Sequence, residues 1–247
     1  MAEPLIRMDG VHVAYNGDIM VLQGIDLDIS RGQVTGIIGP NGAGKSTVLK
    51  TIFGLLQVKS GSLSLNGRDI SRLKAHERAL EGIAFVPQNR ATFADLSVED
   101  NLLLGCWPFR RDKARIARAL ESVYARFPIL KEKRRDMARS MSGGQQRFVE
   151  IARALIVEPD VILLDEPTAM IAPKISKEIY ALIRQLADDG ATVVLVDQNV
   201  RQCVNVSDRL YVLELGRNKA QGSRDDFASD TQLRDLVAEW VNYKIDH

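Results

Sequence analysis

The chain has 247 residues, 45% of them apolar and 26% charged, and is expected to form one large domain, or a core with a lobe, that needs neither disulfides nor metals to fold. Its 33 Lys and Arg residues nearly cancel its 32 Asp and Glu residues, which removes whole-chain basicity as a reason to expect nucleic-acid binding. Two cysteines, no signal-peptide pattern and no apolar run near the roughly twenty residues of a membrane span exclude a disulfide scaffold and favour a cytoplasmic protein.

Short β-like runs begin the chain, and helices and strands then alternate. Strands are predicted at residues 11–15, 21–29, 34–38, 60–65, 83–86, 161–164, 192–196 and 209–215. Helices are predicted at residues 45–53, 115–127, 175–187 and 201–206, with a helical pattern over 97–155 and an extra helix near 225–240. This order predicts an α/β fold with a largely parallel sheet, an antiparallel edge from the early strands and a helical lobe.

The segment from Gly39 to Ser46 reads Gly-Pro-Asn-Gly-Ala-Gly-Lys-Ser and fits a phosphate loop between an apolar strand and a helix. Glycines let backbone N–H groups curl around phosphate oxygens, and the positive end of the following helix points at the same anion. We expect Lys45 to reach the terminal phosphates and Ser46 to supply a hydroxyl to Mg²⁺. The alternative, a simple glycine turn, does not explain the flanking strand and helix.

Two carboxylates, Asp165 and Glu166, directly follow the apolar run 161–164. At the carboxyl end of a buried strand they would face a nucleotide crevice. Together with the phosphate loop, this position gives Asp165 a role in the Mg²⁺ shell and Glu166 a role in polarising the attacking water. Acidic residues on an exposed turn are the alternative interpretation.

A second candidate anion site, Ser142-Gly143-Gly144-Gln145, begins a helix that is predicted to run to about residue 155. A serine cap with two glycines is typical of an anion-binding helix start. One nucleotide does not need two such sites on one chain. We therefore expect a composite site, in which this motif completes the pocket of a second subunit.

The phosphate loop, the Ser142–Gln145 motif and the run that ends in Asp165-Glu166, in their order and spacing along the chain, resemble the motifs of the nucleotide-binding subunits of ATP-binding-cassette (ABC) transporters, and the resemblance covers almost the entire chain. The resemblance implies a P-loop ATPase core with a mixed sheet, an antiparallel β edge and an inserted helical lobe. It further implies a single domain at 1–247, with the lobe at about 92–157 and a helical tail at about 225–247. Binding of ATP and Mg²⁺, with ATP hydrolysis, is the activity that it implies.

The resemblance also assigns roles to single residues. Tyr15 corresponds to an aromatic residue that stacks on adenine, although a plain loop tyrosine is the alternative. Gln88 corresponds to a glutamine that touches Mg²⁺ and senses the membrane subunit, which would dock on residues 89–100. The residues assigned to nucleotide binding are Tyr15, Gly39, Asn41, Gly42, Ala43, Gly44, Lys45, Ser46, Thr47, Ser142, Gly143, Gly144 and Gln145. The metal set is Ser46, Gln88 and Asp165, and the catalytic set is Glu166 and Gln198.

Two positions depart from the general family pattern. Ala172 stands where the family usually has an aspartate, and Gln198 stands where a histidine normally contacts the terminal phosphate. Because glutamine donates a hydrogen bond but carries no charge, hydrolysis at this site is expected to be slowed. Both departures, with Gln198-Asn199 and the stretch from Pro128 to Leu130, resemble the second ATPase subunit of importers of branched-chain amino acids or of urea and short amides.

The expected partners are transmembrane permease subunits, a second ATPase subunit in a homo- or heterodimer and, indirectly, a substrate-binding protein, with no nucleic acid. The expected location is peripheral, at the cytoplasmic face of the inner or plasma membrane. Three alternatives remain open: a soluble ABC ATPase of DNA repair or translation, a nucleotide-binding regulator with little turnover, and a homodimeric lipid or lipopolysaccharide exporter.

Local charge is uneven even though the whole chain is balanced. Residues 107–139 contain eleven Lys and Arg residues and four Asp and Glu residues, a surplus of seven. A solvated helical face is one interpretation of this surplus. A surface near anionic headgroups or near a partner that tolerates basic residues is the other.

Overall fold

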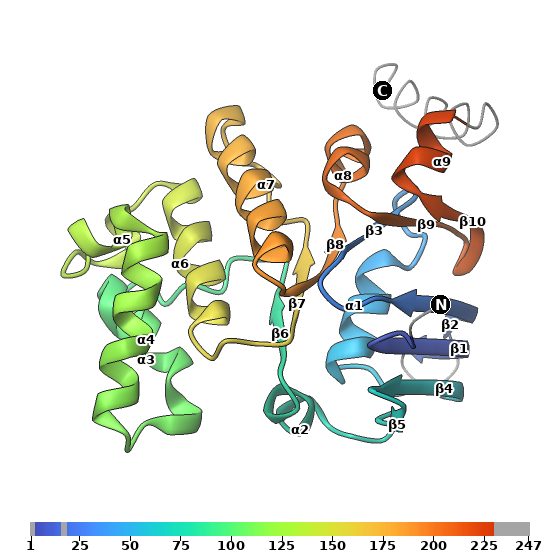
Figure 1. Cartoon of the computed structure of the whole chain (residues 1–247), viewed down its shortest axis with the longest axis horizontal. Helices are drawn as coiled ribbons and strands as arrows, with labels where there is room; N and C mark the ends of the chain where they lie inside the picture. Colours follow the sequence, from blue (N-terminus) through green and yellow to red (C-terminus); the bar gives the residue numbers. More distant parts are fainter. Residues whose placement is uncertain (1–2, 16–18, 230–247) are drawn as a thin grey trace.

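The computed structural model describes residues 3–15 and 19–229, which form two β-sheets, the helices around them and a lobe of helices (Figure 1). The strands are β1 (Ile6–Tyr15), β2 (Ile19–Ile29), β3 (Val34–Ile38), β4 (Ser60–Leu65), β5 (Arg68–Asp69), β6 (Ile83–Val86), β7 (Val161–Asp165), β8 (Thr192–Val196), β9 (Arg209–Glu214) and β10 (Arg217–Ser223). The α-helices are α1 (Lys45–Phe53), α2 (Ala75–Leu80), α3 (Val98–Gly105), α4 (Lys113–Arg126), α5 (Pro128–Glu132), α6 (Gly143–Leu155), α7 (Pro173–Asp188), α8 (Val200–Val206) and α9 (Arg224–Ser229).

The larger sheet has the strand order β10-β9-β3-β8-β7-β6, and only β10 runs antiparallel to its neighbour. Every residue of β3, β7 and β8 is buried, as expected for parallel strands that are covered on both faces. Along β7, Leu163 packs in the core that contains α1, whereas Ile162 and Leu164 pack in the core that contains α7 and the lobe. The predicted parallel sheet is therefore confirmed.

The early strands form a sheet of their own, with the order β2-β1-β4-β5 and antiparallel pairing throughout. The antiparallel pairing predicted for the early strands is confirmed, and the structure adds that they form a sheet separate from the parallel one, whose antiparallel edge strand is β10. The reason is α1, whose buried residues Val48, Leu49 and Ile52 share one core with side chains of both sheets. The helix thus lies between the two sheets and separates them.

A group of four helices, α3 to α6, lies between β6 and β7 in the chain and forms the lobe at the left of Figure 1. The helices share a core in which the rings of Phe127 and Phe148 lie 5.8 Å apart. The expected tail at 225–247 is described only to Ser229, within α9, and its remainder lies outside the described residues.

Three elements were missed from sequence: α2, the two-residue strand β5 and the edge strand β10. The predicted strand 209–215 ends at Glu214, because Leu215 and Gly216 both have positive φ (48° and 77°) and reverse the chain into β10. Turns with two such residues are usually recognised in a sequence by Asn-Gly or Asp-Gly. This turn has leucine at the first position and was therefore not recognised. Within the described residues no helix has both the length and the hydropathy to cross a membrane.

Candidate nucleotide site

The phosphate loop connects β3, which lies between β8 and β9 in the sheet, to α1. Gly44 has φ 97° at the N-cap of α1, a left-handed conformation that glycine adopts without a steric cost. Lys45 is buried, and its Nζ donates hydrogen bonds of 2.9 Å to the carbonyl oxygens of Gly39 and Pro40. The loop therefore curls around its own ammonium group and holds a positive charge at the helix start.

Ser46 and Asp165 meet across the site. The Ser46 hydroxyl donates a 2.8 Å hydrogen bond to Asp165 Oδ1, although the two residues are 119 positions apart in the chain. Burial raises the pKa of Asp165, and the hydrogen bond from Ser46 opposes this shift. A hydroxyl and a buried carboxylate side by side are oxygen ligands of the kind that Mg²⁺ prefers, so the residues present fit the metal.

Glu166 lies one residue beyond the end of β7 and accepts two amide hydrogen bonds. Gln88 Nε2 and Gln198 Nε2 each donate to Glu166 Oε2 at 2.6 Å. Burial is the main cause that raises the pKa of the Glu166 carboxyl, and the hydrogen bond from Gln198 acts in the opposite direction. The structure thus brings the two predicted glutamines to one oxygen of the predicted general base.

The backbone at Glu166 has φ 46°, a left-handed conformation that is uncommon for a residue other than glycine. Its N–H donates to the carbonyl of Val196 at 2.8 Å, which ties the ends of β7 and β8 together. Such conformations persist where the surroundings impose them, and they concentrate at functional sites. No sequence signal predicted it.

A cavity of about 480 Å³ lies against the phosphate loop. Its lining consists of Val21, Asn41, Gly42, Gly44, Lys45, Ser46, Thr47, Gln88, Glu166 and Gln198. Most residues that were predicted from sequence for the phosphates, the metal and the attacking water therefore face one space. Tyr15, half-buried at the end of β1, is not among the described residues of this lining, and neither is any residue of the Ser142–Gln145 motif.

The Ser142–Gln145 motif begins α6 with a capping box. Ser142 Oγ accepts from the Gln145 N–H at 3.3 Å, and Gln145 Oε1 accepts from the Ser142 N–H at 3.0 Å, so the predicted serine cap is confirmed. Packing also favours glycine at position 144, because a Cβ there would lie 2.7 Å from the side chain of Ile175 in α7. Gly143 lines a second cavity of about 660 Å³, on which Gln88, Glu166 and Gln198 also border.

Two residues of α6 that sequence analysis missed bind the segment that carries Gln88. Arg147, which is 4% exposed, donates to the carbonyls of Pro87 and Gln88 at 2.8 and 2.9 Å and pairs with Glu150 at 2.9 Å. Glu150 Oε1 in turn accepts from the Ala91 N–H at 2.7 Å. The helix that begins with the Ser142–Gln145 motif therefore binds the backbone at Pro87 and Gln88 and again at Ala91. The i,i+3 spacing of Arg147 and Glu150, which puts both on one face of the helix, was an available signal.

A buried polar network also supports Gln198 from behind. The preceding residue, Asp197, accepts hydrogen bonds from Thr168 Oγ1 at 3.0 Å and from the Asn199 N–H at 2.8 Å. The hydroxyls of Thr168 and Tyr180 lie 3.0 Å apart. Burial raises the pKa of Asp197, and these donors oppose the shift. The network joins the segment after Glu166 to the segment that presents Gln198.

Comparison with known proteins identifies the family in which this site occurs. The family model described as "ABC transporter" matches residues 22–169. The chain belongs to the ABC transporter family. It is 37% identical to a probable branched-chain amino acid transport ATP-binding protein LivF of Archaeoglobus fulgidus, over 94% of this chain and 98% of that protein. It is 41% identical to a high-affinity branched-chain amino acid transport ATP-binding protein BraG of Pseudomonas aeruginosa, over 82% of this chain and 86% of that protein.

A solved structure of an ATP-binding cassette in a dimeric, post-hydrolysis state bound to ADP and phosphate matches with a TM-score of 0.76 and 27% identity, over 89% of this chain and 98% of that chain. As a member of the ABC transporter family, this chain is an ATP-hydrolysing subunit of a transporter. The family, fold class and ATPase activity that were predicted from sequence are thereby confirmed.

Proposed function

We propose that this ABC transporter ATPase powers the import of branched-chain amino acids or related amides, as one of two ATPase subunits beneath a pair of permeases. The observation that carries the proposal is the similarity to the LivF protein over nearly the full length of both chains. Gln198 and the run Ile171-Ala172-Pro173, which depart from the general family pattern, support the same branch. Neither an export ATPase nor a soluble one is favoured by the two relatives.

In the proposed reaction, the oxygen of a water molecule attacks the γ-phosphorus of ATP, the bond to the β–γ bridging oxygen breaks, and ADP leaves. Glu166 takes the proton of the water, because its desolvated carboxylate is a stronger base than an exposed one. Lys45 would exchange its carbonyl partners for the terminal phosphates. Mg²⁺ held by Ser46 and Asp165, with Gln88 nearby, would supply charge neutralisation on the phosphates.

Gln198 would position both Glu166 and the attacking water. It would also donate a hydrogen bond to a phosphate oxygen. Its amide already lies 2.6 Å from Glu166, and the network of Asp197, Thr168 and Tyr180 restricts where it can move. Without a positive charge it stabilises the phosphate charge less than an imidazolium would. The rate at this site would therefore depend strongly on Glu166.

The Ser142–Gln145 motif would bind the nucleotide of a second ATPase subunit. Its absence from the described lining of the phosphate-loop cavity supports this assignment, since the helix start is exposed at Ser142 and offers N–H groups to an anion outside the chain. The dimeric state of the cassette structure bound to ADP and phosphate is consistent with a composite site.

A permease would dock beside the segment that follows Gln88. An apolar groove of about 580 Å³ lies there, between α2, β6 and the lobe, and it contains Ala91, Leu80 and Trp107. Leu80 and Trp107 are 75% and 64% exposed, and both border this one groove. Arg147 and Glu150 would transmit movement of this segment to α6. The chain would then lie peripherally at the cytoplasmic face of the membrane.

The test is reconstitution. The chain is co-expressed with the permeases and second ATPase of an importer of branched-chain amino acids or urea, and uptake of labelled leucine and of labelled urea into proteoliposomes is measured with the binding protein and ATP. We expect ATP-dependent uptake of one of these substrates, and its loss when Glu166→Gln replaces the parent chain. Uptake that persists without this chain, or export of a lipid substrate by the assembled complex, would overturn the proposal.

A further inference from the structure

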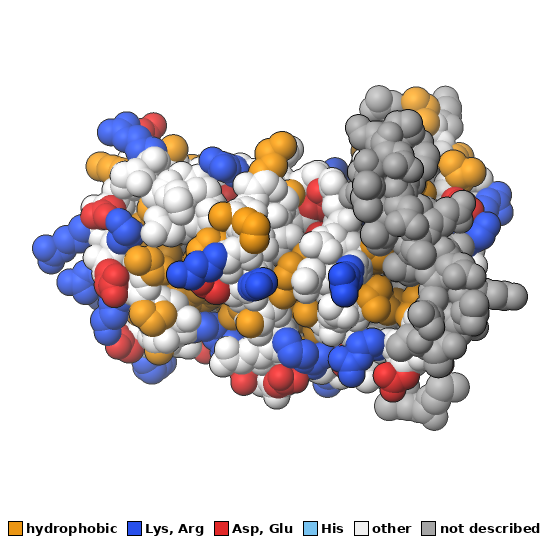
Figure 2. All heavy atoms as spheres, turned by 90° about the horizontal axis from the view of Figure 1, so that it is seen from above, with side chains coloured by type: hydrophobic (Ala, Val, Ile, Leu, Met, Phe, Trp, Pro, Cys, Tyr) orange, Lys and Arg blue, Asp and Glu red, His pale blue; other side chains and the backbone are white. Residues whose placement is uncertain are grey.

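The basic surplus of the lobe divides into two parts in the structure. In the part around α5 and η2 (Ala138–Ser140), three of the five cations pair with carboxylates: Lys131 with Glu121 at 3.0 Å, Lys133 with Asp136 at 3.3 Å and Arg139 with Asp95 at 2.8 Å. Figure 2 shows acidic and basic side chains interspersed over the lobe on the face seen from above. A solvated, charge-balanced surface accounts for this part.

The other part is the segment from η1 (Trp107–Phe109) into α4. It carries five exposed cations, Arg110, Arg111, Lys113, Arg115 and Arg118, and none of them forms an ion pair with a carboxylate of the described residues. Asp112 is the one acidic residue in this stretch, and its side chain caps α4 by accepting from the Arg115 N–H at 2.9 Å. The segment therefore has four uncompensated positive charges.

Their position is unfavourable for the helix. Lys113 and Arg115 occupy the first turn of α4, which contains no acidic residue. The N-terminus of a helix carries a partial positive charge, so cations there cost stability and anions are normally preferred. Asp112 at the N-cap offsets part of this charge, but no carboxylate of the described residues pairs with the exposed cations, and such a segment points to a role outside the fold.

An exposed tryptophan accompanies these cations. The guanidinium of Arg110 lies 4.4 Å from the ring centroid of Trp107, and Arg115 lies 4.3 Å from the ring of Phe109. A hollow of about 310 Å³ lies against Arg110 and Arg111. Indole rings mixed with Arg and Lys are typical of protein surfaces at the headgroup level of a membrane, whereas binding of a free anion gives no reason for an exposed indole.

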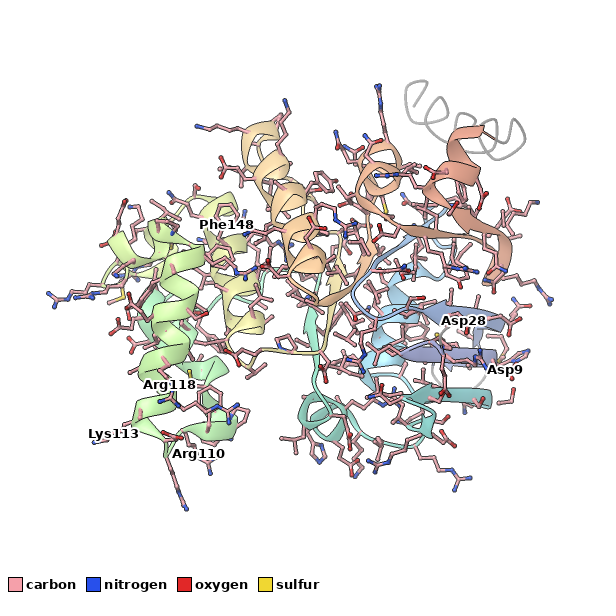
Figure 3. The ribbon with its side chains drawn as sticks, viewed as in Figure 1. Asp9, Asp28, Arg110, Lys113, Arg118 and Phe148 are labelled. Carbon is pink, nitrogen blue, oxygen red and sulfur yellow. The ribbon has the colours of Figure 1, made fainter. Side chains whose placement is uncertain are left out.

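The location agrees with such a contact. Trp107 and Arg110 also line the apolar groove between α2 and the lobe at which a permease would dock. Figure 3 shows Arg110, Lys113 and Arg118 at the lower end of the lobe. Cations beside the groove would therefore lie on the side of the chain that faces the membrane.

We propose that this basic corner, made of Trp107, Arg110, Arg111, Lys113, Arg115 and Arg118, contacts the headgroups of anionic phospholipids and orients the lobe against the membrane. The proposal rests on the proposed function, since a permease in the groove is what brings the corner to the bilayer. The exposed cations would add attraction to a negative leaflet, and Trp107, stacked against Arg110 at the edge of the groove, would lie where permease and headgroups meet.

The experiment compares the full chain with two triple variants in vesicle co-sedimentation. The test variant carries Arg111→Gln, Lys113→Gln and Arg118→Gln, three exposed cations that do not line the groove. The control carries Lys131→Gln, Lys133→Gln and Arg139→Gln, which removes the same charge from cations that already have partners. Vesicles of phosphatidylcholine alone and with phosphatidylglycerol are used at low and high salt. A cation near an anionic surface contributes roughly fivefold, so the test variant is expected to bind anionic vesicles about 100-fold more weakly.

We expect the control to change binding less than tenfold, and high salt or neutral vesicles to abolish binding by the parent chain. Equal losses in the two variants, or no binding by the parent at low salt, would overturn the proposal. So would weaker association of the test variant with the permeases in detergent without lipid, which would indicate an acidic protein surface instead. ATPase activity should be the same in all three chains, which verifies folding. Failure of the proposed function would appear separately, as absence of uptake despite unchanged vesicle binding.

Discussion

The side-chain amide of Gln198 donates a 2.6 Å hydrogen bond to Oε2 of Glu166. A donor at this distance favours the ionised carboxylate and so lowers its pKa, whereas burial favours the neutral acid and raises it. Burial is the larger effect, and the net shift of the Glu166 pKa is upward. Gln198 therefore acts on the strength and availability of the proposed base.

The pH dependence of hydrolysis should report this balance. The reaction needs the Glu166 carboxylate ionised, so kcat is expected to rise with pH through a pKa that lies above the ordinary range of glutamate. Gln198→Ala removes a contact that lowers this pKa. The rise of kcat with pH, the acidic limb of the profile, should therefore move to higher pH, and the maximal kcat should fall. Steady-state ATPase rates across pH measure it. Gln185→Ala, on the exposed face of α7, is the matched control and should leave the limb in place. An unshifted limb in Gln198→Ala would show that the contact does not persist during turnover.

Glu166→Gln should retain nucleotide binding and lose hydrolysis, because an amide keeps the shape of the side chain but does not accept a proton. General bases contribute about 100-fold or more, so the rate should fall by at least that factor. With ATP the variant should elute from gel filtration as a stable dimer. Glu178→Gln, on exposed α7 surface, is the control. Hydrolysis at the parent rate would assign the base elsewhere.

Lys45→Ala should weaken MgATP binding and abolish turnover. The ammonium group is buried among the carbonyls of Gly39 and Pro40, and a contact with a charged phosphate in such a place contributes about 2 kcal/mol, or roughly 30-fold in affinity. Titration with a fluorescent ATP analogue measures it, and exposed Lys59→Ala serves as the control. Unchanged affinity and rate would refute the assignment of this loop.

The phosphate loop and the parallel strands were predictable because each depends on a local pattern with a fixed mechanism. The strands show as apolar runs, and the loop shows as spaced glycines before Lys45. The separate antiparallel sheet was not predictable. Side chains along β1 and β2 alternate between the two faces in the same way, whichever sheet the strand joins. Side-chain burial over α1 decides between them.

The contacts of Arg147 and Glu150 were missed for a different reason. Charged residues within an amphipathic helix normally lie on its exposed face, whereas both of these are nearly fully buried and make their hydrogen bonds to residues about 60 positions away. Gly144 was interpreted as part of an anion site, and the structure adds a contact with Ile175 that sequence spacing did not indicate. Long-range contacts of this kind depend on the assembled fold.

Ala172 offers a prediction about stability. It occupies the N-cap of α7 with an extended backbone, φ −56° and ψ 142°, and gives the helix no side-chain cap. Ala172→Asp would accept from a free N–H of the first turn and is expected to stabilise the chain by about 1 kcal/mol, which raises Tm by about 2–4 °C. Calorimetry measures this change. Ala181→Asp, on the exposed middle of the same helix, is the control and should lower Tm. A lower Tm for Ala172→Asp would show that the cap position is strained.

The last prediction concerns pairing. Two copies of this chain would build two sites that both lack the usual histidine and aspartate, since Gln198 and Ala172 stand there. We therefore expect a second ATPase with His and Asp as the partner. One composite site would then use the partner's loop with the Ser142–Gln145 motif of this chain, and the other would use Lys45 and Glu166 of this chain.

Ser142→Arg separates the two sites, because it fills the exposed helix start from which N–H groups would reach the partner's nucleotide. In the purified transporter, vanadate trapping of photoreactive ATP followed by gel separation of the subunits should show labelling lost from the partner and retained on this chain. Ser140→Arg, exposed two residues earlier, is the control and should leave both labels. Loss of label from this chain alone would contradict the pairing. A purified complex with two copies of this chain and no second ATPase would refute it, as would a homodimer whose turnover is unchanged by Gln198→His.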